Sequence, residues 1–88
     1  MALEPWMREV NEAGLARVAE ALALRVDGNI LCTGCGCALE SDFSAWRCLR
    51  CQSRGDALTY AALALRTGRT WRAVREALAA RGLCRPAA

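Results

Sequence analysis

Histidine and lysine are both absent from this chain of 88 residues, whose basic side chains are twelve arginines. Without histidine, a metal site of mixed cysteine and histidine ligands is impossible. No apolar run approaches the ~20 residues that a membrane-spanning helix needs. The first residues include Glu4 and Pro5 in place of a basic start and a long apolar segment, so they are unlike a signal peptide. These absences predict a cytoplasmic protein that does not enter a membrane.

The chain is also too short for more than one small domain. A folded chain of this length buries only roughly 60 to 65% of the surface that its unfolded form exposes, so its core is marginal unless a metal or cross-link stabilises it. The composition, 55% hydrophobic and 24% charged, is that of a globular, helix-prone chain. We therefore expect one domain over residues 1–88, with residues 1–10 as an N-terminal extension, residues 85–88 as a frayed tail and no enzymatic activity of its own.

Charge is divided unevenly along the chain. Residues 1–45 hold seven acidic residues and three arginines, whereas residues 46–88 hold nine arginines and two acidic residues. A solvated helix surface explains such a basic region without any function. The alternative is a site for an anionic partner such as nucleic acid, which selects clustered arginines.

The six cysteines carry the most specific signal in the sequence. Two Cys-x-x-Cys pairs separated by twelve residues have a spacing typical of metal sites: Cys32, Cys35, Cys48 and Cys51. Each pair brings two thiolates to one side of a tight turn, and two such turns complete a tetrahedral sulfur site suited to one Zn²⁺. Four thiolates leave no open position on the ion, so this zinc is expected to be structural. Disulfides are the alternative, which a reducing compartment disfavours.

Two cysteines remain outside this set. Cys37 lies two residues beyond a ligand, where we expect it to be spare because binding through it would distort the turn. Cys84 is predicted to be a free or packing thiol. A thioredoxin-like redox site is disfavoured, because it needs one reactive pair in a strand–helix–strand setting. Four thiolates and one Zn²⁺ add a charge of −2, so the formal charge falls from +3 to +1 and DNA binding must depend on local arginines.

The hydrophobic pattern predicts one helix before the cysteines, over residues 11–23. Its buried face is formed by apolar residues at helical spacing: Leu15, Val18, Ala19 and Leu22. Pro5 suits the first turn of a short helix over residues 4–10 that precedes it.

The cysteine region itself has the pattern of short strands. Residues 24–26 and 30–32 are predicted to pair across an Asp-Gly-Asn turn at residues 27–29 and to lead into the first Cys-x-x-Cys turn. Residues 43–48 are predicted to form another strand that ends at the second such turn. Two cysteine knuckles on short antiparallel strands are typical of a zinc ribbon.

Two helices are predicted after the cysteines. The first begins after a turn and N-cap at Gly55 and Asp56 and ends at residues 67–68. Thr70 is expected to cap the second, which Gly82 terminates. Both helices have apolar positions at helical spacing: Leu58, Ala61, Ala62 and Leu65 in the first, and Trp71, Val74 and Leu78 in the second. The predicted fold is α+β, a small zinc ribbon flanked by an N-terminal helix and two C-terminal helices.

Three segments resemble the zinc-binding domain of bacterial and phage DNA primases. Residues 17–35, which end in Cys-Thr-Gly-Cys, resemble the start of that domain. Residues 46–60 look like the family's aromatic-x-Cys-x-x-Cys segment followed by Gly-Asp and an apolar helix. Residues 68–74 are similar to its closing turn and short helix. The resemblance covers residues 15–83, nearly the whole chain.

This chain departs from the family pattern in ways that bear on function. It has cysteine at all four ligand positions, as some phage primase-helicases do, where many primases have one histidine. The segment between the knuckles is short, and Arg54 stands where the family usually has glycine. The acidic, metal-binding catalytic domain that makes primers is missing, so this chain alone is not expected to be a primase.

The resemblance implies that the domain recognises a single-stranded DNA template for a separate catalytic primase, primase-helicase or polymerase protein. Single-strand sites combine cationic side chains for phosphates with aromatic faces for bases. Residues on or beside the second knuckle supply both: Phe43, Trp46, Arg47, Arg50 and Arg54. Strand alternation places Phe43 and Trp46 on opposite faces, so at most one is expected to be exposed. Trp46 has a second interpretation, as a lid packed over the zinc site.

Two alternatives remain open. A second series of arginines at intervals of three is interrupted by Gly68 and is more simply a solvated surface than a phosphate site: Arg66, Arg69, Arg72 and Arg75. The alternative function is a small zinc-ribbon protein that binds or inhibits a polymerase, helicase or nuclease, with its contacts around Trp71 or the acidic first helix.

Overall fold

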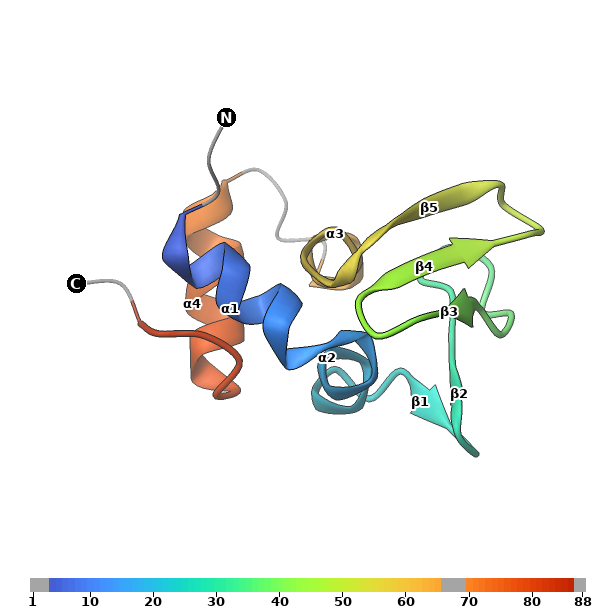
Figure 1. Ribbon diagram of the computed structural model, residues 1–88, viewed down its shortest axis with the longest axis horizontal. Helices are drawn as coiled ribbons and strands as arrows, with labels where there is room; N and C mark the ends of the chain where they lie inside the picture. Colours follow the sequence, from blue (N-terminus) through green and yellow to red (C-terminus); the bar gives the residue numbers. More distant parts are fainter. Residues whose placement is uncertain (1–3, 66–69, 87–88) are drawn as a thin grey trace.

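The computed structural model describes residues 4–65 and 70–86, which form an α+β fold with four helices and two small antiparallel sheets (Figure 1). The predicted fold class is confirmed. The predicted helix end at residues 67–68, and with it Arg66 and Arg69, lies outside the described residues. The elements follow in the order α1 (Pro5–Ala13), α2 (Leu15–Ala21), β1 (Arg25–Val26), β2 (Asn29–Ile30), β3 (Glu40–Ser41), β4 (Ala45–Cys48), β5 (Ser53–Asp56), α3 (Ala57–Leu65) and α4 (Trp71–Ala80).

The N-terminal segment is divided at Gly14, where the sequence predicts a continuous helix over residues 11–23. Gly14 has a φ of +93°, a conformation that other residues rarely adopt. The backbone N–H of Leu15 donates to the carbonyl of Phe43 at 2.7 Å. A Cβ at position 14 would lie 3.0 Å from two atoms of the Phe43 ring. The expected helix is therefore interrupted because a turn distant in the sequence packs against it, a contact that hydrophobic spacing does not reveal.

α1 belongs to the core. Trp6 and Val10 are buried, with 2% and 0% of their surface exposed, so the described part of the expected N-terminal extension packs as part of the domain. The indole N–H of Trp6 has a hydrogen-bond partner as well, because Nε1 donates to a carboxylate oxygen of Glu4 at 2.6 Å. Residues 4–10 thus supply apolar surface that a domain of this size needs.

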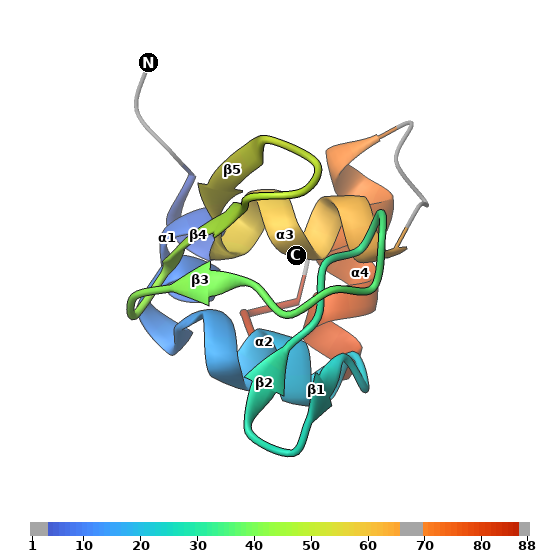
Figure 2. The same ribbon diagram turned by 90° about the vertical axis from the view of Figure 1, so that its right-hand side faces the viewer.

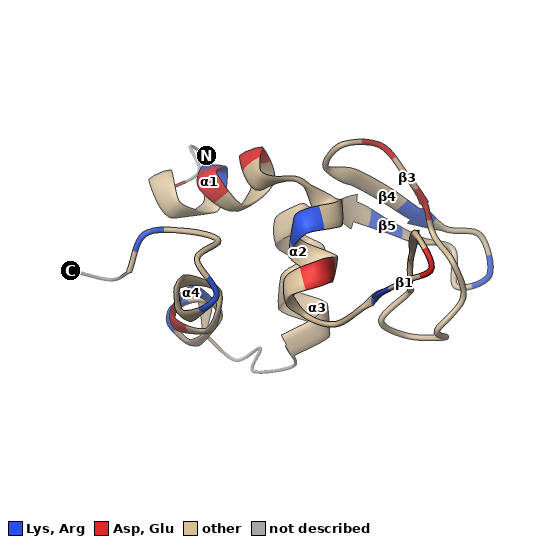
Figure 3. Cartoon of the chain, turned by 90° about the horizontal axis from the view of Figure 1, so that it is seen from below, with Lys and Arg blue, Asp and Glu red and all other residues tan. Residues whose placement is uncertain are grey.

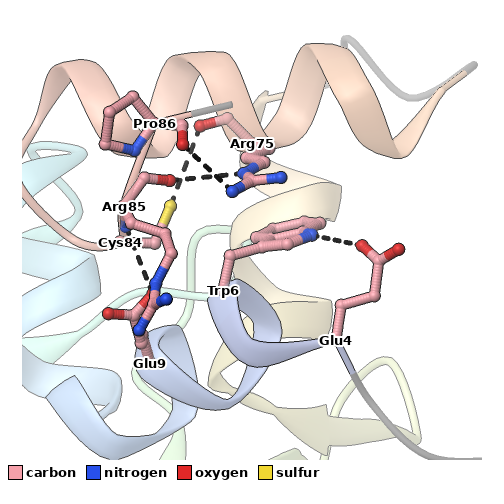
Figure 4. Close-up of polar contacts among 7 residues, drawn as sticks. All are labelled: Glu4, Trp6, Glu9, Arg75, Cys84, Arg85 and Pro86. Atoms are coloured by element: carbon pink, nitrogen blue, oxygen red, sulfur yellow. Dashed lines mark hydrogen bonds and ion pairs between the residues drawn. The ribbon is translucent and has the colours of Figure 1, made fainter. Parts of the chain in front are cut away.

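The C-terminal segment, expected to fray, is held against α1 and α4 (Figure 4). Arg85 Nε lies 2.9 Å from a carboxylate oxygen of Glu9, and the Arg85 guanidinium and backbone N–H hold the pKa of Glu9 below its usual value. Arg75 donates to the carbonyls of Arg85 and Pro86 at 3.3 and 3.0 Å. The same guanidinium lies over the Trp6 ring, 5.8 Å from its centroid. Polar contacts to two helices therefore fix residues 85 and 86.

The first sheet is the predicted hairpin. β1 and β2 pair across a two-residue turn at Asp27 and Gly28, both of which have positive φ. Such a turn matches the twist of paired strands, and Asp-Gly is one of its preferred sequences. A single bridge from Leu31 to Ala38 continues the pairing beyond this hairpin.

The second sheet has the strand order β3-β4-β5 and carries the second cysteine pair. The strand predicted from residue 43 begins only at Ala45, because Phe43 lies in the turn between β3 and β4. That turn is closed by the backbone N–H of Asp42, which donates to the Ala45 carbonyl at 2.9 Å. Gly55, predicted as a turn, is instead paired with Trp46 in the middle of the sheet. A Cβ there would lie 3.3 Å from the indole nitrogen, so a glycine allows close packing rather than a turn.

Three predicted helix boundaries after the cysteines are confirmed, namely the starts of α3 and α4 and the end of α4. The Asp56 carboxylate accepts the backbone N–H of Thr59 at 2.8 Å at the start of α3. At the start of α4, the Thr70 hydroxyl accepts a hydrogen bond from the backbone N–H of Ala73 at 3.2 Å. Gly82, with a φ of +74°, follows the last turn of α4.

The hydrophobic core lies between the helices, with α3 in the middle and α1, α2 and α4 around it (Figure 2). Most residues of the predicted helix faces are buried: Leu15, Val18 and Ala19 in α2, Leu58 and Ala61 in α3, and Val74 and Leu78 in α4. Leu22, Ala62 and Leu65 are partly buried. Trp71 is the exception, because it is 51% exposed at the start of α4. Across the described ranges, no helix combines the length and apolar character needed to cross a membrane. The strands extend from this core, to which β2 contributes Ile30 and β4 contributes Trp46.

Candidate metal centre and ribbon surface

The two cysteine pairs lie on tight turns that direct backbone N–H groups at sulfur. In the first, Gly36 donates its N–H to the Cys32 carbonyl at 3.0 Å, and the N–H of Gly34 lies 3.4 Å from Cys32 Sγ. In the second, between β4 and β5, the N–H of Cys51 lies 3.4 Å from Cys48 Sγ. These contacts favour the thiolate form that a metal ion requires.

Four sulfur atoms meet where the turns approach each other, all within 4.8 Å of one another. The Sγ atoms of Cys32 and Cys51 are 3.9 Å apart, and those of Cys35 and Cys48 are 3.6 Å apart. Metal–sulfur bonds of about 2.3 Å in a tetrahedron place neighbouring sulfurs roughly 3.8 Å apart. A disulfide needs about 2.05 Å, and all six cysteines, each within the described residues, are free. The four predicted ligands therefore form a cluster that can hold a metal ion.

The thiols of this cluster do not ionise independently. Burial opposes ionisation of Cys32, but N–H groups of Cys35 and Gly34 and neighbouring thiols donate to it, and together they lower its pKa to about 7. Hydrogen bonds with the sulfurs of Cys35, Cys48 and Cys32 raise the pKa of Cys51 to about 12. Ionisation of Cys32 is thus favoured, whereas Cys51 stays protonated and donates a hydrogen bond to a neighbouring sulfur. A cation bound among the four sulfurs would allow all of them to be thiolates at neutral pH.

Cys37 lies outside the cluster, although it is close in sequence. Its carbonyl accepts the backbone N–H of Cys32 at 2.8 Å, and its sulfur accepts a hydrogen bond from Arg50 at 3.7 Å. The Cys37 sulfur, followed by the other nearby sulfurs, raises the pKa of Arg50. Arg50, a predicted DNA contact, thus joins the tip of the second knuckle to the first. Cys84 is half-buried on the helices and its sulfur lies 3.8 Å from the Arg75 carbonyl.

Two of the predicted DNA contacts are neighbours on the solvent face of the second sheet. Arg47 in β4 lies directly opposite Arg54 in β5 and, on its other side, opposite Glu40 in β3. Arg47 Nη2 is 2.7 Å from a carboxylate oxygen of Glu40. The side chain of Arg54 makes no ion pair or hydrogen bond to any residue in the described part of the chain. Figure 3 shows the basic positions of β4 and β5 beside the acidic position of β3.

The two aromatic candidates lie in different environments. Trp46 is only 4% exposed; its Nε1 donates to the Asp56 carbonyl at 2.8 Å, and its ring contacts Tyr60 edge to face at 5.9 Å. Its ring is therefore not accessible to a base, contrary to its selection as a stacking residue. Phe43 is 69% exposed, but it lies in the turn at the end of β4 away from the knuckle, against Gly14. At most one of the two was expected to be exposed and only Phe43 is, but Phe43 lies in a turn and not in the strand whose alternation gave that expectation.

Two residues that the sequence analysis did not single out also shape this region. Tyr60 is fully buried in α3, and its hydroxyl donates to the Leu31 carbonyl at 2.5 Å, directly before the first ligand. Burial, and then the charge of Cys32, raise the pKa of Tyr60 to about 12, so it remains a donor. Leu49, at the tip of the second knuckle, is 63% exposed. The available signals were a lone tyrosine inside an apolar stripe and a leucine between two cysteines of the cluster.

No family model matches this chain, and neither a curated protein nor a solved structure is significantly similar to it.

Proposed function

We propose that this protein is a non-catalytic, zinc-dependent module whose ribbon binds single-stranded DNA in the cytoplasm for a separate priming enzyme. The observation that carries the proposal is the pair of directly opposed arginines, Arg47 and Arg54, beside a cluster of four cysteines. Zinc is proposed as the ion because it prefers a tetrahedral set of four thiolates and needs no open position in a structural site.

The charge arrangement supports an anionic partner. Like charges directly opposite each other on antiparallel strands destabilise a sheet. Only Arg47 of this pair has a counter-ion in the described chain, and that ion pair is exposed. An anion that approaches the solvent face relieves the repulsion, and a nucleic-acid backbone offers a phosphate at each nucleotide.

The exposed side chains around this pair suit a flexible single strand better than a duplex. Phe43 at one end of β4 offers a face on which a base can stack, a contact worth about 1 to 3 kcal/mol. Leu49 at the other end offers an apolar contact beside the knuckle. The described part of the ribbon presents no helix that is shaped to enter a major groove.

The role in primer synthesis rests on the resemblance of residues 15–83 to primase zinc-binding domains. In those proteins such a domain acts with a catalytic primase, primase-helicase or polymerase. We propose the same division of work here, with the template held by the ribbon and the chemistry performed elsewhere. The four helices then provide the surface for that protein partner.

A second candidate function has one specific observation in its favour. Trp71, at the start of α4, is 51% exposed, and its ring centroid lies 6.2 Å from that of the buried Trp6. Exposed tryptophans that pack on a buried side chain are frequent anchors of protein interfaces. A zinc-ribbon factor that binds or inhibits a polymerase, helicase or nuclease is therefore the alternative, with this surface as its contact.

The proposal is tested by titrating the zinc-loaded chain with a dodecamer of deoxythymidine at low and moderate salt. We expect NMR shifts at Phe43, Arg47 and Arg54 and an affinity that falls steeply with salt. Substitution of Arg54 by Ala should weaken binding. Substitution of Arg81 by Ala, an exposed arginine at the end of α4, is the matched control and should leave binding unchanged.

Metal analysis of the protein purified without added metal tests the choice of ion, with one zinc per chain as the expected result. Shifts confined to the helices, or no binding at low salt, would contradict the DNA proposal. Binding of a protein partner through Trp71 would then favour the alternative.

A further inference from the structure

We propose that Arg47 and Arg54 form a phosphodiester-binding site and that Glu40 competes with DNA for Arg47. This inference deepens the proposed function and rests on it. Glu40, Arg47 and Arg54 are register partners on three adjacent strands, so their side chains leave the sheet on the same face. Arg47 therefore has a carboxylate on one side and a second guanidinium on the other.

The two arginines line two shallow depressions of different charge. One is also lined by Glu40 and Asp42, which disfavour an anion there. The other has no acidic residue in its described lining, which consists of Arg47, Cys48, Leu49, Gln52, Ser53 and Arg54. Two guanidinium groups and the polar side chains of Gln52 and Ser53 are suitable donors for phosphate oxygens. A phosphodiester is therefore expected in the second depression, beside the knuckle.

The ion pair with Glu40 draws Arg47 toward the acidic depression. Carboxylates and phosphates both accept hydrogen bonds from a guanidinium through charged oxygens. Glu40 therefore occupies the N–H donors of Arg47 that a phosphate would use. The Arg47 and Glu40 side chains are 62% and 57% exposed, and exposed pairs of this kind are weak. Arg47 can thus exchange Glu40 for phosphate, at an affinity reduced by the strength of the pair.

Removal of the carboxylate should therefore strengthen DNA binding. We expect Glu40→Gln to lower the Kd of the zinc-loaded chain for fluorescein-labelled dT12 by about two- to fivefold, the range that an exposed ion pair allows. Asp42→Asn is the matched control. Asp42 lines the same depression, and its substitution removes the same charge, but Asp42 forms no ion pair with Arg47. Its effect should be clearly smaller.

A double-mutant cycle separates competition for Arg47 from a general change of charge. Arg47→Ala should weaken binding, and Glu40→Gln should add nothing in the Arg47→Ala background. An equal gain in both backgrounds, or an equal gain for Asp42→Asn, would contradict the competition. Metal content and thermal unfolding of each variant establish that the ribbon is intact.

The two levels of the proposal fail in different ways. If the unmodified chain binds dT12 in a salt-dependent manner but Glu40→Gln changes nothing, the competition is wrong and DNA binding stands. If neither the unmodified chain nor Glu40→Gln binds dT12 at low salt, the proposed function is wrong and the inference falls with it.

Discussion

The two ends of this molecule are stabilised in different ways. The helical half, residues 5–21, 57–65 and 70–83, supplies most of the buried apolar side chains. The ribbon half, residues 25–56, supplies few buried residues, and two of them are the cluster cysteines Cys32 and Cys48. The helical half therefore depends on apolar burial, whereas the ribbon half depends on its cysteine cluster.

This difference matches what each half is proposed to do. A surface that binds DNA must expose charged side chains on one face of its short strands, which leaves few positions for a core. A metal ion stabilises such a segment without burying large apolar groups. The helices, which carry no such constraint, bury their apolar faces against α3. The two halves meet at Gly14 and Asp56, and these positions test how strongly one half depends on the other.

The largest effect is expected when the cluster itself is removed. Cys48→Ser should abolish stoichiometric zinc binding and unfold the ribbon half, because structural zinc contributes on the order of 10 kcal/mol in small zinc domains. The helical half should keep part of its circular-dichroism signal, since most residues of the hydrophobic core lie in the helices and only Ile30 and Trp46 of the described core come from the ribbon. Metal titration and two-dimensional NMR spectra measure the two results.

Cys37→Ser and Cys84→Ser are the matched controls, since neither sulfur belongs to the cluster. Both variants should bind one zinc ion per chain. Loss of zinc in Cys37→Ser would show that this residue is a ligand after all. A Cys48→Ser protein that keeps the NMR spectrum of the ribbon would contradict the comparison between the halves.

A cavity in the helical core should have the next largest effect. Leu78 is fully buried in α4, and Leu78→Ala should lower the free energy of unfolding by about 2 to 5 kcal/mol. Because Leu78 lies away from the ribbon, the variant should still bind one zinc ion. Urea denaturation and metal titration check these expectations. Loss of both stability and zinc would mean that the halves fold only as one unit.

The junction at Gly14 should be sensitive to a single methyl group. Gly14→Ala is expected to lower the free energy of unfolding by about 1 to 3 kcal/mol, because it combines an unfavourable φ with a contact to Phe43. Gly28→Ala has a similar φ but nothing within 4 Å of its Cβ, so urea denaturation should show a smaller loss. Equal losses would show that packing of Phe43 on Gly14 contributes nothing.

The smallest effect is expected at the junction of β5 and α3. Asp56→Ala removes the N-cap and should lower the free energy of unfolding by about 0.5 to 2 kcal/mol at neutral pH, whereas Asp56→Asn keeps an acceptor and should lose less. Burial alone would raise the pKa of Asp56, but N–H donors from Thr59 and Asn11 outweigh it and lower the pKa.

The sign of the pH dependence follows from this direction. The stabilisation from ionised Asp56 is complete above its unfolded pKa of about 3.9 and is lost as the pH falls through the lower folded value. The difference in stability between the unmodified chain and Asp56→Asn should therefore shrink in acid. Acid also protonates the cysteines of the cluster in both chains, so the two chains are compared with each other at each pH. A constant difference across this range would contradict the charge contribution.

Features that depend on local sequence could be predicted. The cysteine spacing identified the four clustered sulfurs, and Asp-Gly identified the turn between β1 and β2. Asp56 and Thr70 were recognisable as caps because a cap needs only a side-chain acceptor three residues before an N–H group. Each of these features is determined by residues a few positions apart.

Features that depend on contacts between distant parts of the sequence could not be predicted. The interruption at Gly14 requires the turn at Phe43, and the burial of Trp46 requires Tyr60 from α3. Arg85 is fixed by Glu9, 76 positions earlier. The pairing of Arg47 with both Glu40 and Arg54 depends on strand register, which the short segments did not specify.

The direct junction of β5 and α3 limits how the length of this chain can change. β5 ends at Asp56 and α3 begins at Ala57, with no residue between them. One residue inserted there would rotate the helix by about 100° and turn Tyr60 away from the first knuckle. The turn at Asp27 and Gly28 is exposed and has open space around it. Peptide tags or spectroscopic probes therefore belong in that turn. The junction of β5 and α3 fixes the orientation of the ribbon relative to the helices, and so relative to any partner that the helices bind.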